Sequence, residues 1–271
     1  MNHLLNSDQY IDVLKKSLIG WSEIGSTKWV RCHKGFEGFV NWVLGRIGLA
    51  QYQICKSHTI KLEAKFNGSE RFPNGLTMIG LMRLNHLEVC IKDVVKNNVP
   101  GDFIETGVWR GGATIFMRGL LDVLGDTTRN VWVADSFEGL PDFDRTNERE
   151  AKRDLDPSKL LVVSLDEVKR NFKNYNLLDQ RVKFLKGWFK DTIPTAPIEQ
   201  LSILRLDGDY YESTMTVLEH LYPKLSPGGY LIIDDYSLNY CRNAVEDYRN
   251  SHGITEPIQK IDWTGVYWKK S

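Results

Sequence analysis

From about Gly101 onward, short apolar runs alternate with polar or amphipathic segments of helical length, and this alternation limits the fold most strongly. Five runs are candidate strands, namely DFIETG, VWVADS, RVKFLKGWF, LSILRLDG and GYLIIDDY. Strands that alternate with helices favour a doubly wound, mostly parallel sheet with helices on both faces. The C-terminal PIQKIDWTGVYWKKS alternates like two strands joined by a turn at Thr264 and Gly265. The sequence therefore predicts an α/β fold whose sheet is closed by an antiparallel C-terminal strand.

The first part of the chain has a different pattern. SDQYIDVLKKSLIGW and TMIGLMRLNHLEVCIKDVVKNN have helical spacing, Ser7 and Thr77 are candidate N-caps, and KLEAKFNGSERFPNG has the composition of a loop. We expect a mainly helical appendage over residues 1–95, followed by a sheet domain over 96–271. The appendage has many aromatic residues, which include Trp21, Trp29, Phe36, Phe39 and Trp42. They either line a sugar or polyketide pocket or form the appendage's own core or a dimer contact.

Composition excludes several classes of function. Lys and Arg total 35 and Asp and Glu total 35, so no net charge attracts the chain to nucleic acid or to an anionic membrane. A small neutral or mixed-charge substrate is expected instead. The four cysteines lack C-x-x-C spacing, which argues against a zinc site or a disulfide framework. No secretory leader is visible, and FVNWVLGRIGLA is too short to span a membrane, so the sequence predicts a cytoplasmic protein.

A glycine-rich turn follows the first candidate strand. In FIETGVWRGGAT, Glu105 and Thr106 end the strand, and Gly107, Gly111 and Gly112 precede a helix. Such glycines let a ligand approach the backbone, and the helix N-terminus offers N–H groups to an anion, although the same turn is also ordinary packing chemistry. The spacing G-x-x-x-G-G differs from the dinucleotide pattern G-x-G-x-x-G, which argues against NAD.

The second candidate strand ends in VADSFEGLP, which places Asp135 where an acid accepts hydrogen bonds from both ribose hydroxyls. The alternative is that Asp135 caps the next segment. A glycine turn together with this acid favours S-adenosylmethionine over NAD. Glu105 and Asp135 are expected to orient this cofactor. Five further residues are candidates for the adenine wall, namely Ser136, Phe137, Gly187, Trp188 and Phe189. Thr77 and Met78 of NGLTMIG are expected near its methionine end, in a segment that closes over the cofactor.

Three carboxylates follow two other candidate strands. Asp207 follows LSILRL, and Asp234 and Asp235 follow GGYLII. In a doubly wound sheet these two strands are neighbours, so their carboxyl ends bring the three acids to one edge. Hard oxygen ligands of this kind suit Mg²⁺. In the alternative interpretation, Asp235 caps the next helix and Asp207 pairs with an arginine such as Arg205.

Several of these blocks together resemble the TylF/MycF family of macrolide-sugar O-methyltransferases, which includes the novobiocin noviose methyltransferase. The blocks are FIETGVWRGGATIFMRGLL, VADSFEGLP, FLKGWFKDT, LRLDGDYYESTM and GGYLIIDDY. The resemblance runs from about Phe72 to the C-terminus, and residues 1–70 do not match. It implies a Rossmann-like class I methyltransferase fold, S-adenosylmethionine, Mg²⁺ and a small sugar-containing acceptor.

The resemblance also assigns roles to residues. Asp207, Asp234 and Asp235 fall on the family's metal ligands, and Asp207 also on its catalytic base. Glu105, Gly107 and Asp135 fall on cofactor positions. A homodimer or a higher homo-oligomer is expected.

Two other functions stay open. A catechol-type O-methyltransferase uses similar carboxylates, but its usual pattern has an Asp-Asn pair where this chain has Asp234 and Asp235. A cofactor-binding module without catalysis would have no need of three metal ligands.

Overall fold

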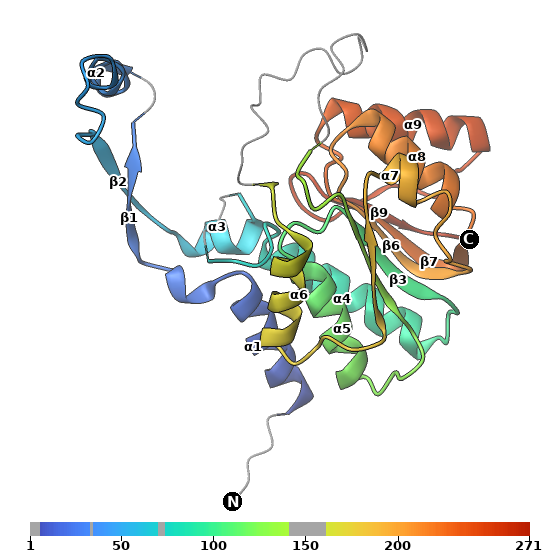
Figure 1. Ribbon diagram of the computed structural model, residues 1–271. Helices are drawn as coiled ribbons and strands as arrows, with labels where there is room; N and C mark the ends of the chain where they lie inside the picture. The colour runs from blue at the N-terminus through green and yellow to red at the C-terminus, as the bar shows by residue number, and fades with distance from the viewer. Residues whose placement is uncertain (1–5, 33–34, 70–73, 141–160) are drawn as a thin grey trace, which may run out of the picture.

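The computed structural model describes residues 6–32, 35–69, 74–140 and 161–271. Its centre is a seven-stranded sheet in the order β5-β4-β3-β6-β7-β9-β8 (Figure 1). The parallel strands are β3 (Asp102–Thr106), β4 (Val131–Asp135), β5 (Val182–Lys186), β6 (Leu201–Leu206) and β7 (Leu225–Ile233). The antiparallel strands are β8 (Gln259–Lys260) and β9 (Val266–Lys269). The predicted parallel sheet and its antiparallel closure are therefore confirmed.

Helices cover both faces of the sheet and enclose two apolar cores. One core contains residues of α1 (Ser7–Leu18), α4 (Leu81–Lys96), α5 (Gly112–Val123) and α6 (Leu165–Asn174). The other contains residues of α8 (Tyr211–Leu221) and α9 (Asn239–His252). Successive strand residues alternate between them: Phe103 packs in the first core and Ile104 in the second. This alternation explains the continuous apolar runs of the central strands, because all positions of β6 and all but one in each of β3 and β4 are buried on one face or the other.

The start of the chain corrects three local predictions. Asn6, not Ser7, caps α1, because its side chain accepts a hydrogen bond from the backbone N–H of Asp8. Helix α4 begins at Leu81 after Gly80, so Thr77 is not its N-cap, and the Thr77 hydroxyl accepts from the N–H of Ile79 in the preceding turn.

The third correction concerns a segment predicted to be a loop. Residues Leu62–Asn67 form a short helix, α3. The Lys65 side chain is fully buried there, and its Nζ donates to the Ile19 carbonyl and to Glu23. Contacts with residues distant in the sequence therefore stabilise a helix that local composition does not indicate.

A hairpin arm extends from this region away from the sheet (Figure 1). Strands β1 (Thr27–Arg31) and β2 (Cys55–Thr59) pair antiparallel, and helix α2 (Gly35–Arg46) lies between them in the sequence. The described residues of segment 1–95 are thus mainly helical, as predicted, and they also form a hairpin that was not predicted. Four of the five aromatic residues noted above form no core for this region, since Trp29, Phe36, Phe39 and Trp42 are 57–77% exposed.

Helices α1 and α4 share a core with the sheet, and the division of the chain at residue 95 stays a prediction. The remaining described helices are a short 3₁₀ helix, η1 (Trp21–Glu23), and α7 (Phe189–Thr192). Among the described helices, none has both the length and the apolar character needed to cross a membrane.

Candidate active site

The glycine turn after β3 lies directly against the end of β6. Gly107 has a φ of +88°, and a Cβ atom at this position would lie 1.8 Å from the carbonyl oxygen of Asp207. Its N–H donates to the carbonyl of Ala134 at 2.8 Å, so the turn also contacts the end of β4. Because only glycine fits this space and conformation, Gly107 brings three strand ends close together.

Asp135 anchors this turn from the end of β4. Its two carboxylate oxygens accept the backbone N–H groups of Val108 and Phe137, each at 2.8 Å. Burial raises the pKa of Asp135, whereas these backbone donors act to lower it. The Ser136 hydroxyl, at 3.4 Å, and the Trp109 N–H also reach this carboxylate, so a ribose hydroxyl would share or replace one of these donors.

A cleft of about 380 Å³ opens where these strand ends meet. Six of the residues that line it were proposed from the sequence: Gly107, Asp135, Ser136, Trp188, Phe189 and Asp207. The other four are Gly139, Leu140, Gly208 and Ser213, which lie within the motifs singled out above. Sequence reasoning therefore found the motifs that form the cleft but not every residue within them.

The other proposed cofactor residues lie around the cleft and do not line it. The N–H of Gly187 donates to the Asp135 carbonyl at 3.0 Å, and Phe137 is 5% exposed. Gly111 is the residue before α5, and the N–H of Gly112 donates to the Leu76 carbonyl at 2.9 Å. This bond places the segment with Thr77 and Met78 against the glycine turn, and contact of these two residues with a cofactor stays a prediction.

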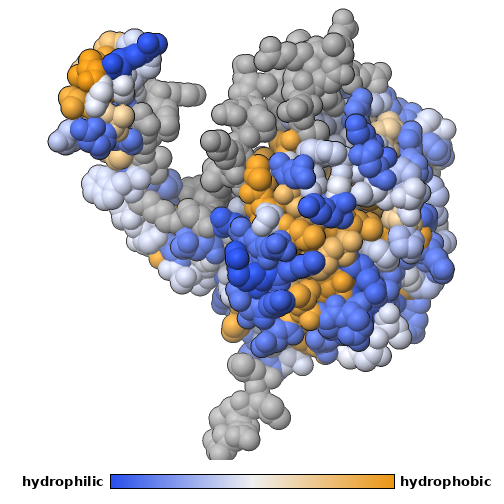
Figure 2. Space-filling model, in the orientation of Figure 1, coloured by the Kyte–Doolittle hydropathy of each residue, from blue (hydrophilic) through white to orange (hydrophobic). Residues whose placement is uncertain are grey.

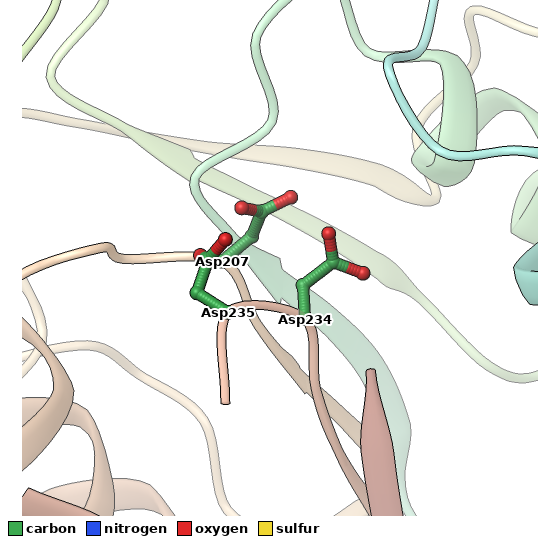
Figure 3. A group of neighbouring side chains, drawn as sticks. All are labelled: Asp207, Asp234 and Asp235. Carbon is green, nitrogen blue, oxygen red and sulfur yellow. The ribbon is translucent and has the colours of Figure 1, made fainter. Parts of the chain in front are cut away.

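Asp207, Asp234 and Asp235 meet at the carboxyl ends of β6 and β7, as predicted. One carboxylate oxygen from each lies within 4.8 Å of the others, and Figure 3 shows the three side chains grouped together. Two backbone bonds fix this arrangement, because the N–H of Asp207 donates to Thr106 and that of Asp234 to Leu206, each at 2.9 Å.

The three carboxylates differ in their surroundings. Asp234 is buried, and its two oxygens accept from two different guanidinium groups, those of Arg205 and Arg83. Asp207 accepts from Arg205 at 3.1 Å, and its side chain is 30% exposed. Oδ2 of Asp235 is buried and has no hydrogen-bond partner among the described residues.

These contacts test both parts of the alternative interpretation, in which Asp207 pairs with an arginine and Asp235 caps the next helix. Asp207 does pair with Arg205, so this part of the alternative is confirmed, although the three acids also lie together. Asp235 does not cap α9, since the N-cap residue of that helix is Leu238.

Glu105 lies deeper than sequence analysis expected for a cofactor ligand. It is opposite Arg205 in the pairing of β3 with β6 and is 2% exposed, and its Oε1 accepts a hydrogen bond from the guanidinium group of that arginine. Burial raises the pKa of Glu105 to about 8, although Arg205 acts to lower it. Its Oε2 has no hydrogen-bond partner in the described parts of the chain. Glu105 thus contacts Arg205, which in turn contacts Asp207 and Asp234.

The cluster holds more negative than positive charge. Burial and the neighbouring Asp234 raise the pKa of Asp207 to about 6, and burial and Asp207 raise the pKa of Asp235 well above its usual range. Only two guanidinium groups contact these acids within the described residues, those of Arg83 and Arg205. Protons or a cation are therefore needed to balance the remaining charge.

A family model described as macrocin-O-methyltransferase (TylF) matches residues 7–270. The chain belongs to this family. This confirms the resemblance drawn from the sequence but corrects its extent, because the match begins at residue 7 and not at about Phe72. The family's members are O-methyltransferases.

Related proteins agree with this assignment. The chain is 54% identical over 196 residues, 71% of this chain and 75% of the relative, to the 8-demethyl-8-(2,3-dimethoxy-alpha-L-rhamnosyl)-tetracenomycin-C 4'-O-methyltransferase of Streptomyces olivaceus. It is 51% identical to the mycinamicin III 3''-O-methyltransferase of Micromonospora griseorubida, over 77% of this chain and 84% of the relative. The solved structure of the O-methyltransferase NovP has a TM-score of 0.81 at 42% identity, covering 98% of this chain and 100% of NovP. This similarity confirms the class I methyltransferase fold.

Proposed function

We propose that this protein is an S-adenosylmethionine- and Mg²⁺-dependent O-methyltransferase that acts on a sugar hydroxyl of a glycosylated natural product. One observation carries the proposal: Asp207 lines the cleft and also belongs to the group of three carboxylates. A methyl donor in the cleft and an acceptor at the carboxylates would therefore meet at Asp207. Relatives named for a rhamnosyl tetracenomycin and for mycinamicin support a sugar-containing acceptor.

The cleft has features that suit S-adenosylmethionine. Gly107 leaves its backbone open to a ligand, Asp135 offers acceptor oxygens for ribose, and Trp188 offers an aromatic wall for adenine. When bound, this cofactor supplies an electrophilic methyl group on a sulfonium. The protein's task is then to hold the acceptor oxygen in line with that methyl group and to exclude water.

The carboxylates have features that suit Mg²⁺. Bonds of about 2.1 Å to oxygen place opposite ligands of one octahedral ion about 4.2 Å apart. Ligand atoms that lie within 4.8 Å of one another need only small side-chain rotations to reach this separation. The buried, unpartnered Oδ2 of Asp235 is a donor atom in need of a partner. When bound, Mg²⁺ lowers the pKa of a coordinated hydroxyl and orients it.

Asp207 is the proposed general base. Unlike Asp234 and Asp235, it lines the cleft, and its pKa of about 6 makes the metal-free carboxylate a better proton acceptor than an ordinary aspartate. Asp234 is held by two arginines and serves as a fixed ligand. A bound cation would lower the pKa of Asp207.

Methyl transfer to a panel of sugar diols and aromatic diols tests this function. The protein is incubated with labelled S-adenosylmethionine and each diol, with Mg²⁺ or with EDTA. Transfer to sugar diols that EDTA abolishes supports the proposal. Transfer only to aromatic diols would favour a catechol-type enzyme, and cofactor binding without any transfer would favour a non-catalytic module.

We also propose that two copies associate through the hairpin arm. Its exposed aromatic residues are Trp29, Phe36, Phe39 and Trp42, and Figure 2 shows apolar residues gathered at the end of the arm. Four large rings that are 57–77% exposed leave roughly 400–650 Å² of apolar surface in water. This area reaches the upper range for a monomer and approaches the ~800 Å² that each partner buries in a stable interface.

Light scattering on the whole protein checks this association. A dimer that becomes a monomer in the Phe36→Ser, Trp42→Ser double variant supports the proposal. A monomeric wild type, or a dimer unaffected by the two changes, would contradict it.

A further inference from the structure

Arg83 of α4 connects the N-terminal part of the chain to the group of three carboxylates. Its side chain is 7% exposed. Nη1 donates to Oδ2 of Asp234, and Nε donates to Oδ2 of Asp262 at 2.7 Å. One rigid guanidinium group therefore joins Asp234, one of the three carboxylates, to Asp262, which is 28 positions later in the sequence.

Asp262 is itself fixed by the turn before β9. Its Oδ1 accepts the N–H groups of Thr264 at 3.0 Å and Gly265 at 2.8 Å. The Thr264 hydroxyl donates to the backbone carbonyl of Asp234 at 2.9 Å. Because β9 pairs antiparallel with β7, this turn lies beside the end of β7, where Asp234 follows. Both the side chain and the backbone of Asp234 are thus held by groups outside β7.

The other two carboxylates lack a comparable clamp. Asp207 has one arginine partner and is partly exposed, and Oδ2 of Asp235 has no partner among the described residues. Asp234 is consequently the carboxylate whose position the surrounding structure determines most completely. A carboxylate with one guanidinium bond on each oxygen still has lone pairs free for a cation.

We propose that Arg83 is a positioning residue, which holds Asp234 in the orientation needed to bind the divalent cation. This inference rests on the metal site proposed above. Groups that orient metal ligands commonly change metal affinity by about 10- to 100-fold when they are altered.

Charge and position predict opposite effects, which makes the proposal testable. The positive charge of Arg83 repels a nearby cation, so removing it should strengthen metal binding if charge were its only contribution. Loss of positioning should weaken metal binding. Arg83→Lys keeps the charge but loses the rigid fork that contacts two carboxylates, and Arg83→Met removes both.

The test measures Mn²⁺ binding by electron paramagnetic resonance, with the whole protein saturated with S-adenosylhomocysteine. We expect Arg83→Lys to raise the Mn²⁺ dissociation constant about tenfold or more, and Arg83→Met to raise it as well. Calorimetry should show S-adenosylhomocysteine affinity within about twofold of wild type for both variants. An unchanged Mn²⁺ affinity in Arg83→Lys, or a tighter one in Arg83→Met, would overturn the proposal.

Two further variants guard against a purely structural effect. Arg118→Lys is the matched control, because Arg118 is also a buried helical arginine with two carboxylate partners, Asp122 and Asp179. Its Mn²⁺ affinity should equal that of wild type, and a loss equal to that of Arg83→Lys would overturn the proposal. Thr264→Val keeps size and charge but removes the bond to the Asp234 carbonyl, and it should also weaken Mn²⁺ binding.

The outcomes separate this inference from the function on which it rests. Wild-type protein that binds no Mn²⁺ would overturn the metal site and, with it, the role of Arg83. Wild-type binding with no change in Arg83→Lys and Thr264→Val would overturn only the positioning role.

Discussion

Asp234 and Asp235 are adjacent in the sequence, yet changing each to Asn should affect the metal-free protein very differently. Asp234 has a guanidinium group on each oxygen. Asn keeps one oxygen but turns an NH₂ group toward the other arginine, which needs an acceptor. Breaking a buried ion pair in this way costs about 3–5 kcal/mol of unfolding free energy.

Asp235 has no such partner. Its Oδ2 is unpartnered among the described residues, and burial, together with the neighbouring Asp207, raises its pKa. Replacing it with a neutral side chain of the same shape removes a repulsion and breaks no ion pair. We therefore expect the unfolding free energy of Asp235→Asn to stay within about 1 kcal/mol of wild type.

Differential scanning calorimetry in EDTA measures this contrast. For a chain of this size, 1 kcal/mol corresponds to about 2–4 °C in melting temperature, so Asp234→Asn should melt about 6–20 °C lower and Asp235→Asn close to wild type. Mn²⁺ titration should show weaker metal binding in both variants. Equal melting temperatures for Asp234→Asn and wild type, or an equal loss in the two variants, would refute the reasoning.

Three other predictions follow from the same site. Burial raises the pKa of Glu105 to about 8, so between pH 4.5 and 8 the folded chain keeps a proton that the unfolded chain has released. The free energy of unfolding in EDTA should therefore fall as the pH rises from about 4.5 to about 8. Urea titrations at several pH values should show this fall, and Glu105→Gln should show a shallower one. Gly107→Ala should abolish S-adenosylhomocysteine binding or folding, because its Cβ would meet the Asp207 carbonyl oxygen. Gly125→Ala is the control: Gly125 also has a positive φ, but no atom lies within 4 Å of an added Cβ, so this variant should bind normally. Normal binding by Gly107→Ala in calorimetry would contradict the close contact between Gly107 and Asp207. Calorimetry should also give S-adenosylhomocysteine affinities that agree within tenfold in Mg²⁺ and in EDTA, and a larger difference, above about 1.4 kcal/mol, would count against separate sites for cofactor and metal.

The sequence predicts the sheet and the three aspartates for the same physical reason. Strands buried on both faces leave continuous apolar runs, and the polar residues that end those runs lie at one edge of the sheet. The positions of Asp207, Asp234 and Asp235 could therefore be inferred from local pattern and strand order alone.

The surroundings of these aspartates could not be inferred in the same way. Arg83 and Asp262 are 179 positions apart, and nothing in either local sequence indicates that they meet. Sequence analysis considered Arg205 as a partner of Asp207 alone, but it also contacts Glu105 and Asp234. Such contacts depend on how helices and turns pack against the sheet, which local periodicity does not encode.

The N-terminal part was predicted least well. Strands β1 and β2 are five residues each and are separated by α2, so no short turn marks them as a hairpin. Helix α3 depends on the buried Lys65 and its contacts with Ile19 and Glu23, which lie more than 40 positions earlier in the chain.

One divalent cation is proposed to bind the three carboxylates beside the cofactor cleft. A crystal grown with Mn²⁺ and S-adenosylhomocysteine tests this directly through anomalous diffraction near the manganese absorption edge. We predict one strong anomalous peak within coordination distance of Asp207, Asp234 and Asp235, with S-adenosylhomocysteine in the cleft beside it. A crystal with S-adenosylhomocysteine bound but no anomalous peak at these carboxylates, or with its peak elsewhere, would show that they are not a metal site.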